Sequence, residues 1–198
     1  MNKVKKLGIL LFNEAEVLDF SGPFEVFAIC SKENSDERFF EVCTIAENSQ
    51  IIRATDGLMV QPQYDFSNAP ELDILIVPGG TGAEEIEIHN QRLLDWIRQQ
   101  SEKVELLASV CTGAFLLAEA GLLKGRRATT HWMYLDRLER EYPSITVERN
   151  TRYVDLGSII TSAGISAGID MSLYIAGRYF GRDTAEYTAK RMEYDWRY

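Results

Sequence analysis

The sequence predicts an α/β sandwich, built around a mostly parallel sheet that carries helices on both faces. Two observations support this prediction. Continuous apolar runs, such as residues 72–77, have the composition of strands that are buried on both faces. These runs alternate with segments whose apolar residues recur at helical spacing, which is the order expected when helices cross over between parallel strands.

The N-terminal half is expected to begin with a buried strand at 4–12, followed by an acidic loop at 13–20. Ser21 is the expected N-cap of the first helix, because Pro23 is tolerated within a first helical turn. The other elements expected in this half are a charged turn at 32–37, a strand at 39–46, a hairpin at 50–60 turning at Asp56-Gly57, a loop at 64–70, a strand at 72–77 ended by the turn 78–82, and an amphipathic helix beginning at Asn90.

The C-terminal half is expected to contain a strand that ends at Cys111, followed at once by a helix that stops near Gly121. A second helix is expected to begin at His131, and Asp183 is the expected cap of the last helix. The remaining expected elements are a short β segment at 127–130, strands at 146–149, 152–155 and 158–161, and a helix that follows residues 162–165.

Length and composition predict a single domain over residues 1–198, since the chain contains no internal repeat or linker. A net charge of −9 disfavours nucleic acid and anionic membrane surfaces as partners. The chain has no apolar stretch near the ~18 residues of a membrane span. Its N-terminal apolar run is also short for a signal peptide. We therefore expect a cytoplasmic, reducing location, in which an exposed thiol stays reduced.

Cysteine and histidine usage does not predict a metal site. The three cysteines, Cys30, Cys43 and Cys111, form no C-x-x-C pair, and there are only two histidines, His89 and His131. Cys30 and Cys43 lie in apolar helix and strand patterns and are expected to be core residues.

Cys111 lies where a strand is followed directly by a helix. Such a tight turn pushes the thiol out of the end of the sheet, and the first N–H groups of the helix favour the thiolate. These features predict a nucleophile. The alternative is a small packed residue at the end of a strand, because free cysteine is among the most buried residue types.

A thiolate nucleophile also needs hydrogen-bond donors for developing charge and a group that transfers protons. The N–H groups of Gly79, Gly80 and Thr112 are candidate donors. Asp19 is the candidate acid or base, although spacing alone does not distinguish it from Glu14 and Glu16. His131 is a rival base. Asp19, Gly79-Gly80 and Cys111 each follow a predicted parallel strand, so we expect them to meet at one edge of the sheet.

Several motifs together resemble the ThiJ/PfpI superfamily, which has the class I glutamine amidotransferase-like fold. They are the segments ILIVPGGTG at 74–82, SVCTG at 109–113, GRRATTHW at 125–132, LDFSGP at 18–23 and AGISAGID at 163–170. Within the superfamily, the sequence is most similar to isocyanide hydratases and to the ligand domains of AraC-type regulators.

The resemblance implies a flavodoxin-like three-layer sandwich and a homodimer that acts on a small molecule without a cofactor. It also implies that Cys111 lies in a strained nucleophile elbow, with Asp19 beside its sulfur and the amides of Gly80 and Thr112 nearby. His131, Ala163 and Ile165 are candidates for the pocket. Hydratases have glycine where this chain has Ala163, so its methyl group is expected to crowd Cys111.

The leading hypothesis is hydration of an isocyanide to an N-substituted formamide, in which Cys111 attacks and Asp19 transfers protons. Thr112 follows the cysteine where peptidases and amidases of the superfamily have histidine, which argues against peptidase chemistry. Because the sequence stops at Tyr198, we expect it to lack the helix-turn-helix domain of the regulators. The alternatives are a glyoxalase-like enzyme, a cysteine oxidation sensor and a small-molecule-binding domain.

Overall fold

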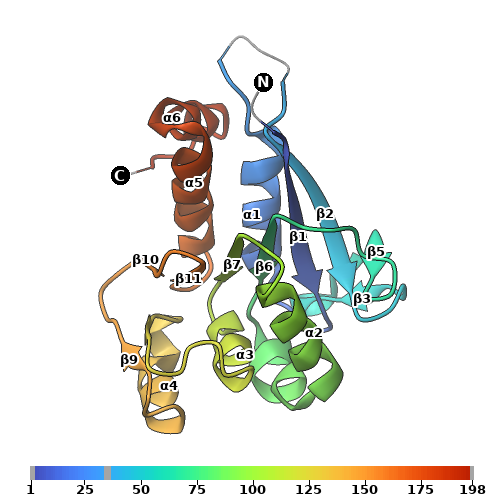
Figure 1. Ribbon diagram of the computed structural model, residues 1–198, viewed down its shortest axis with the longest axis vertical. Helices are drawn as coiled ribbons and strands as arrows, with labels where there is room; N and C mark the ends of the chain where they lie inside the picture. Colours follow the sequence, from blue (N-terminus) through green and yellow to red (C-terminus); the bar gives the residue numbers. More distant parts are fainter. Residues whose placement is uncertain (1–2, 34–36, 197–198) are drawn as a thin grey trace.

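The computed structural model describes residues 3–33 and 37–196 (Figure 1). Its centre is a seven-stranded sheet in the order β10-β11-β7-β6-β1-β2-β5. β10 is antiparallel to β11, and all the other neighbours are parallel. The strands of this sheet are β1 (Lys5–Leu11), β2 (Phe40–Ala46), β5 (Tyr64–Asp65), β6 (Ile74–Val77), β7 (Leu106–Ser109), β10 (Tyr153–Asp155) and β11 (Ile159–Ser162).

Helices cover both faces of the sheet (Figure 1). One layer contains α1 (Val17–Ile29), α5 (Ala167–Phe180) and α6 (Arg182–Arg191), which pack on one another. The other contains α2 (Gln91–Ser101) and α3 (Gly113–Glu119) with the helical turns η2 (Gly82–Ile86) and η3 (Glu87–His89). The structure thus confirms the predicted α/β sandwich and its mostly parallel sheet.

Smaller elements flank this sandwich. A β3–β4 hairpin turns through η1, and a parallel pair, β8 and β9, packs beside α4. Their bounds are β3 (Ile52–Arg53), η1 (Thr55–Gly57), β4 (Met59–Val60), β8 (Arg127–Ala128), η4 (Trp132–Tyr134), α4 (Leu135–Glu141) and β9 (Thr146–Val147).

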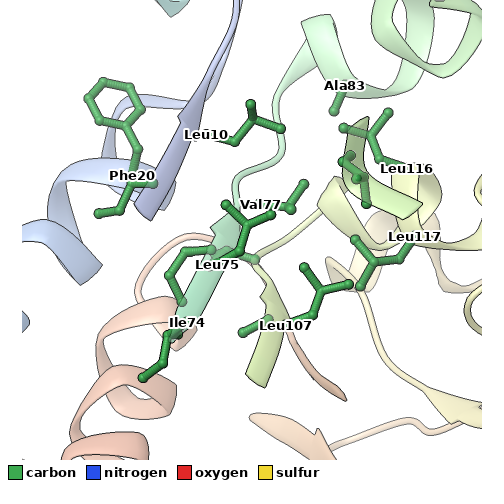
Figure 2. Packing of buried hydrophobic residues seen from close by; sticks show 14 of the residues in the cluster. Leu10, Phe20, Ile74, Leu75, Val77, Ala83, Leu107, Leu116 and Leu117 are labelled. Carbon is green, nitrogen blue, oxygen red and sulfur yellow. The ribbon is translucent and has the colours of Figure 1, made fainter. Parts of the chain in front are cut away.

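The core lies between the sheet and the helices. β6 and β7 are buried along their whole length, as their unbroken apolar sequences predict. Figure 2 shows side chains from these strands gathered with Leu116 and Leu117 of α3 in one hydrophobic cluster. This packing fixes the strand ends, and the loops that leave them, relative to one another.

The first helix begins five residues before the predicted start, since its N-cap is Glu16 and not Ser21. It starts at Val17, so Asp19 lies in its first turn and not in a loop. Ser21 is not the N-cap, because its hydroxyl donates to the Val17 carbonyl at 2.8 Å inside the helix. Pro23 is therefore inside the helix, where it has no N–H to donate to the carbonyl of Asp19, four residues earlier.

Other local predictions also need correction. The predicted loop 64–70 begins with strand β5, because Gln63 hydrogen-bonds to Thr44 and brings the next residues into register with β2. The turn after β6 continues into η2 and η3, which the sequence did not predict. Gly181, with φ 91°, precedes the last helix in place of Asp183. Residues 34–36 of the predicted charged turn lie outside the described residues.

Several local predictions are confirmed. Asn90 caps α2, since its side chain accepts a hydrogen bond from Leu93 N–H at 3.3 Å. The 50–60 hairpin turns at Asp56-Gly57, where both residues have positive φ. Over residues 3–33 and 37–196, no helix has the length and apolar character needed to cross a membrane.

We expect Leu75→Ala to lower the free energy of unfolding by about 2–5 kcal/mol, because Leu75 is fully buried in the middle of the sheet. Met59→Ala on the exposed hairpin is the control and should change it by less than about 0.5 kcal/mol. Urea denaturation measures both values. Equal effects of the two substitutions would contradict this description of the core.

Candidate active site

The predicted site residues meet at one edge of the sheet, where β1, β6 and β7 end. Because these strands are parallel, Leu11, Val77 and Ser109 end them on the same side. The loops after them are tied together: Glu16 N–H donates to the Gly79 carbonyl at 2.9 Å, and Val110 N–H donates to the Val77 carbonyl at 2.9 Å. The predicted convergence of these three strand ends is therefore found in the structure.

The end of β11 contributes a fourth loop. The N–H of Cys111 donates to the Ala163 carbonyl at 3.2 Å, and the Ile165 N–H interacts with both Cys111 and Asp19. The resemblance had placed Ala163 and Ile165 only in the pocket. A backbone amide has no residue-type signature, so the sequence could not identify Ile165 as a hydrogen-bond donor.

Cys111 occupies a strained turn between β7 and α3. Its φ is 56°, in the left-handed region that residues other than glycine rarely adopt. The strand ends at Ser109, two residues earlier than predicted, because the chain must turn before the cysteine. The Thr130 hydroxyl holds this geometry by donating to the Cys111 carbonyl at 2.7 Å. Sequence reasoning had not assigned Thr130 a role.

Asp19 is fully buried beside the thiol. Its Oδ2 accepts a hydrogen bond from Gly79 N–H at 3.0 Å, and its carboxyl group also interacts with the Cys111 thiol. Burial raises the pKa of Asp19 to about 7. Within the part of the chain that the structure describes, Oδ1 has no hydrogen bond of standard geometry, which leaves one carboxyl oxygen for a reacting group.

The pKa of Cys111 is raised, which is opposite to the predicted direction. Burial is the main cause, and the charge of Asp19 adds to it. The N–H groups of Thr112 and Ile165 point at the sulfur and partly offset this effect. The helix argument overestimated the stabilisation of the thiolate, because it left out the cost of burying a charged sulfur. Ionisation of the carboxyl group therefore opposes ionisation of the thiol, and the two groups titrate as a coupled pair.

The two loop glycines are present at the site, but their amides are already used. Gly79 N–H donates to Asp19, and Gly80 N–H donates to Thr112 Oγ1 at 2.9 Å. Neither is free to bind an oxyanion in this structure, contrary to the expected donor set. The amides that face the sulfur belong to Thr112, which was expected, and to Ile165.

The contacts that the structure describes for the His131 side chain, which include Met133 and Gly164, do not reach the Cys111 thiol. Its Nδ1 accepts a hydrogen bond from Met133 N–H at 3.3 Å and caps the turn η4. Its ring lies against Gly164, where a Cβ atom would come within 1.9 Å of it. Burial lowers the pKa of His131, which favours its neutral form at pH 7.

An open groove of about 600 Å³ is lined by neighbours of Cys111, although Cys111 and Asp19 do not line it themselves. Three of its lining residues, Thr130, Ala163 and Ile165, also contact the backbone or sulfur of Cys111. Trp132 stands at the groove with 73% of its surface exposed. The groove is therefore wide enough for a substituent on a small reactive group.

The described residues contain no cluster of three or more His, Cys, Asp or Glu side chains able to hold a metal ion. Cys30 and Cys43 are buried in the core, as predicted, and burial raises the pKa of each to about 11.

A model of the DJ-1/PfpI family matches residues 5–177. The chain belongs to the DJ-1/PfpI family. It is 35% identical over 190 residues to isonitrile hydratase of Pseudomonas putida, a match that covers 96% of this chain and 78% of the hydratase. It is 26% identical over 191 residues to the HTH-type transcriptional regulator GbdR of Pseudomonas aeruginosa, where 96% of this chain spans about half (51%) of the regulator.

Solved structures of the family show the same fold. A ThiJ/PfpI family protein from Pseudomonas syringae superimposes with a TM-score of 0.83 at 27% identity, over 100% of this chain and 78% of that one. Drosophila melanogaster DJ-1beta also has a TM-score of 0.83 at 19% identity, over 98% and 100% of the two chains. The family thus includes proteins that are named as enzymes and others that are named as regulators.

The raised pKa of Asp19 makes a prediction about stability and pH. The folded protein holds this proton up to about pH 7, whereas the unfolded chain releases it near pH 3.8. The contribution of Asp19 to stability is therefore complete below pH 3.8 and is lost as pH rises through 7. Between pH 4 and pH 8, urea denaturation should show the wild type losing about 4 kcal/mol relative to Asp19→Asn. A difference that does not change with pH would contradict the buried, raised-pKa carboxyl group.

Proposed function

We propose that this DJ-1/PfpI family member is a cysteine-dependent hydratase that converts isocyanides to N-substituted formamides. The observation that carries the proposal is the pairing of the Cys111 thiol with a buried carboxyl group whose pKa is about 7. The 35% identity to a protein named isonitrile hydratase supports the same chemistry, since an isonitrile is an isocyanide.

The first half of the reaction uses the proton that sulfur and carboxyl share. Asp19 accepts the thiol proton as sulfur attacks the terminal carbon of the isocyanide. Asp19 then delivers that proton to the same carbon, so the product is the thioimidate Cys111–S–CH=N–R. A group whose pKa lies near the working pH is suited to both transfers. The amides of Thr112 and Ile165 stabilise negative charge on the sulfur before the new bond forms.

The second half adds water to the thioimidate carbon. The nitrogen gains a proton, the C–S bond breaks with its electron pair remaining on sulfur, and R–NH–CHO leaves. The hydroxyl proton of the collapsing intermediate passes to Asp19, which restores the shared pair. One water is consumed for each isocyanide, with no change in oxidation state and no cofactor.

The raised pKa of Cys111 weighs against the oxidation-sensor alternative, because sensor cysteines are low-pKa and accessible thiols. Cys111 is only 6% exposed. The proposal also includes the expected single domain, homodimer and cytoplasmic location; sedimentation velocity of the purified protein tests the dimer.

We expect the protein to convert cyclohexyl isocyanide to N-cyclohexylformamide, measured by gas chromatography. Cys111→Ala should lower this activity by ~10³-fold or more, and Asp19→Asn by ~10²-fold or more. Cys43→Ala, which removes a buried thiol from β2, is the matched control and should keep wild-type activity. The absence of formamide from the wild type, or its continued formation by Cys111→Ala, would exclude the proposed reaction.

The groove predicts which part of the substrate Trp132 contacts. If the substituent R lies against this exposed ring, Trp132→Ala should raise KM for cyclohexyl isocyanide by ~10-fold while kcat stays within ~2-fold. For methyl isocyanide, which is too small to reach the ring, KM should change by less than ~2-fold. Equal changes in KM for the two substrates would place the substituent elsewhere.

A further inference from the structure

The open groove that neighbours of Cys111 line carries a positive charge that the proposed reaction does not use. Among the described residues that line it, Arg152 is the only one with a full charge at pH 7, because burial favours the neutral form of His131 and no Asp or Glu lines it. The chain as a whole has a net charge of −9. A cation in the groove of such an acidic protein attracts an anionic ligand to that place.

Arg152 is tied to Cys111 by two backbone hydrogen bonds that pass through a single residue. Cys111 N–H donates to the Ala163 carbonyl at 3.2 Å, and Ala163 N–H donates to the Arg152 carbonyl at 2.9 Å. Thr130, whose hydroxyl donates to the Cys111 carbonyl at 2.7 Å, lines the same groove as Arg152. The wall of the groove therefore contains both direct neighbours of the nucleophile and the arginine.

The guanidinium group of Arg152 is held in place by two side chains. Its Nε donates to Asp170 Oδ2 at 2.6 Å, and its Nη2 contacts the same oxygen and donates to Ser166 Oγ at 3.2 Å. The Tyr194 hydroxyl donates to the other oxygen of Asp170 at 3.0 Å. Asp170 is 14% exposed and does not line the groove. The carboxylate thus orients the arginine without itself entering the groove.

Donors remain for a ligand on the open side of this group. No hydrogen bond of standard geometry involves Arg152 Nη1 within the part of the chain that the structure describes, and 51% of the side chain is exposed. The Ser166 hydroxyl, which accepts from Nη2 and also lines the groove, can still donate its own proton. Nη1 and this hydroxyl together can each donate to one oxygen of a carboxylate.

The groove also offers an apolar surface for the part of a substituent that carries the charge. Trp132 lines it with an exposed ring. Methylene groups can pack on such a ring while a charged end reaches a cation farther along the wall. A substituent with a short apolar stem and an anionic end therefore matches the groove better than a wholly apolar one.

We propose that Arg152 and Ser166 bind the carboxylate of isocyano carboxylates, which are isocyanides whose substituent ends in a carboxylate. This inference rests on the proposed function. The isocyanide carbon reacts at Cys111 as described above, and the carboxylate accepts hydrogen bonds from Arg152 Nη1 and the Ser166 hydroxyl. Neither residue makes or breaks a bond, so both lower KM for the anionic substrate and leave kcat nearly unchanged.

The test compares 4-isocyanobutanoate with its methyl ester, which has the same stem but no charge. The formamide products are measured at about pH 7 by liquid chromatography with mass spectrometry. For the wild type, KM should be ~10-fold lower for the carboxylate than for the ester, because hydrogen bonds to charged groups are the stronger ones. The two kcat values should agree within ~3-fold.

Arg152→Gln should raise KM for the carboxylate by ~10-fold and for the ester by less than ~2-fold. Because this change leaves Asp170 without its cation, the double variant Arg152→Gln/Asp170→Asn, which carries neither charge, is the second variant and should lose the preference equally. Ser166→Ala should lose ~3-fold of it. A purely structural role of these residues would change KM and kcat alike for both substrates.

Arg178→Gln is the matched control. Arg178 also forms an ion pair with an aspartate, Asp155, at 3.3 Å, but it does not line the groove. This substitution should keep the wild-type preference for the carboxylate within ~2-fold.

Three outcomes would overturn the inference. They are equal KM values for the two substrates in the wild type, a preference that survives in both Arg152 variants, and an equal loss of activity toward both substrates in those variants. In each case, hydration of the ester by the wild type shows that the proposed function still holds. If the wild type hydrates neither substrate and does not hydrate cyclohexyl isocyanide, the proposed function fails and this inference fails with it.

Discussion

The close approach of three loops at Gly79 is the constraint on which the candidate site depends. A Cβ atom there would lie 2.5 Å from Thr112 N and 3.0 Å from Asp19 Oδ2. Because glycine has none, its amide can donate to Asp19 and its carbonyl can accept from Glu16. A single residue after β6 therefore fixes both the first turn of α1 and the carboxyl group that this turn carries.

The buried carboxyl group explains the chemistry that the site supports. A carboxyl group removed from water holds its proton up to about pH 7. Above that pH, its negative charge opposes ionisation of the neighbouring thiol. Nucleophile and acid are thus two positions for one proton. The positive φ of Cys111 and of Ile165, each costing of order 1–3 kcal/mol, turns a sulfur and an amide toward this pair. Packing of the sheet and the hydrogen bonds between the loops offset that strain.

The sequence predicted the fold better than the local details of the site. Apolar runs and helical spacing indicated the parallel sheet, and the residues after three strands indicated where chemistry would gather. The start of α1 was wrong because Ser21 and Pro23 carry strong local signals that the contact between Glu16 and Gly79 overrides. The partners of the Gly79 and Gly80 amides were not predicted, because a sequence does not show which amides already have hydrogen bonds.

By itself, the sequence determined the main strands and helices, their order and the candidate catalytic residues, because periodicity and strand ends are properties of the chain. The tertiary structure alone decided the direction of the Cys111 pKa, the role of the Ile165 amide and the contact between Glu84 and Arg137. Each of these depends on burial and on distances between segments far apart along the chain. Glu84 and Arg137 are separated by 53 positions, and no local pattern of residues encodes their contact.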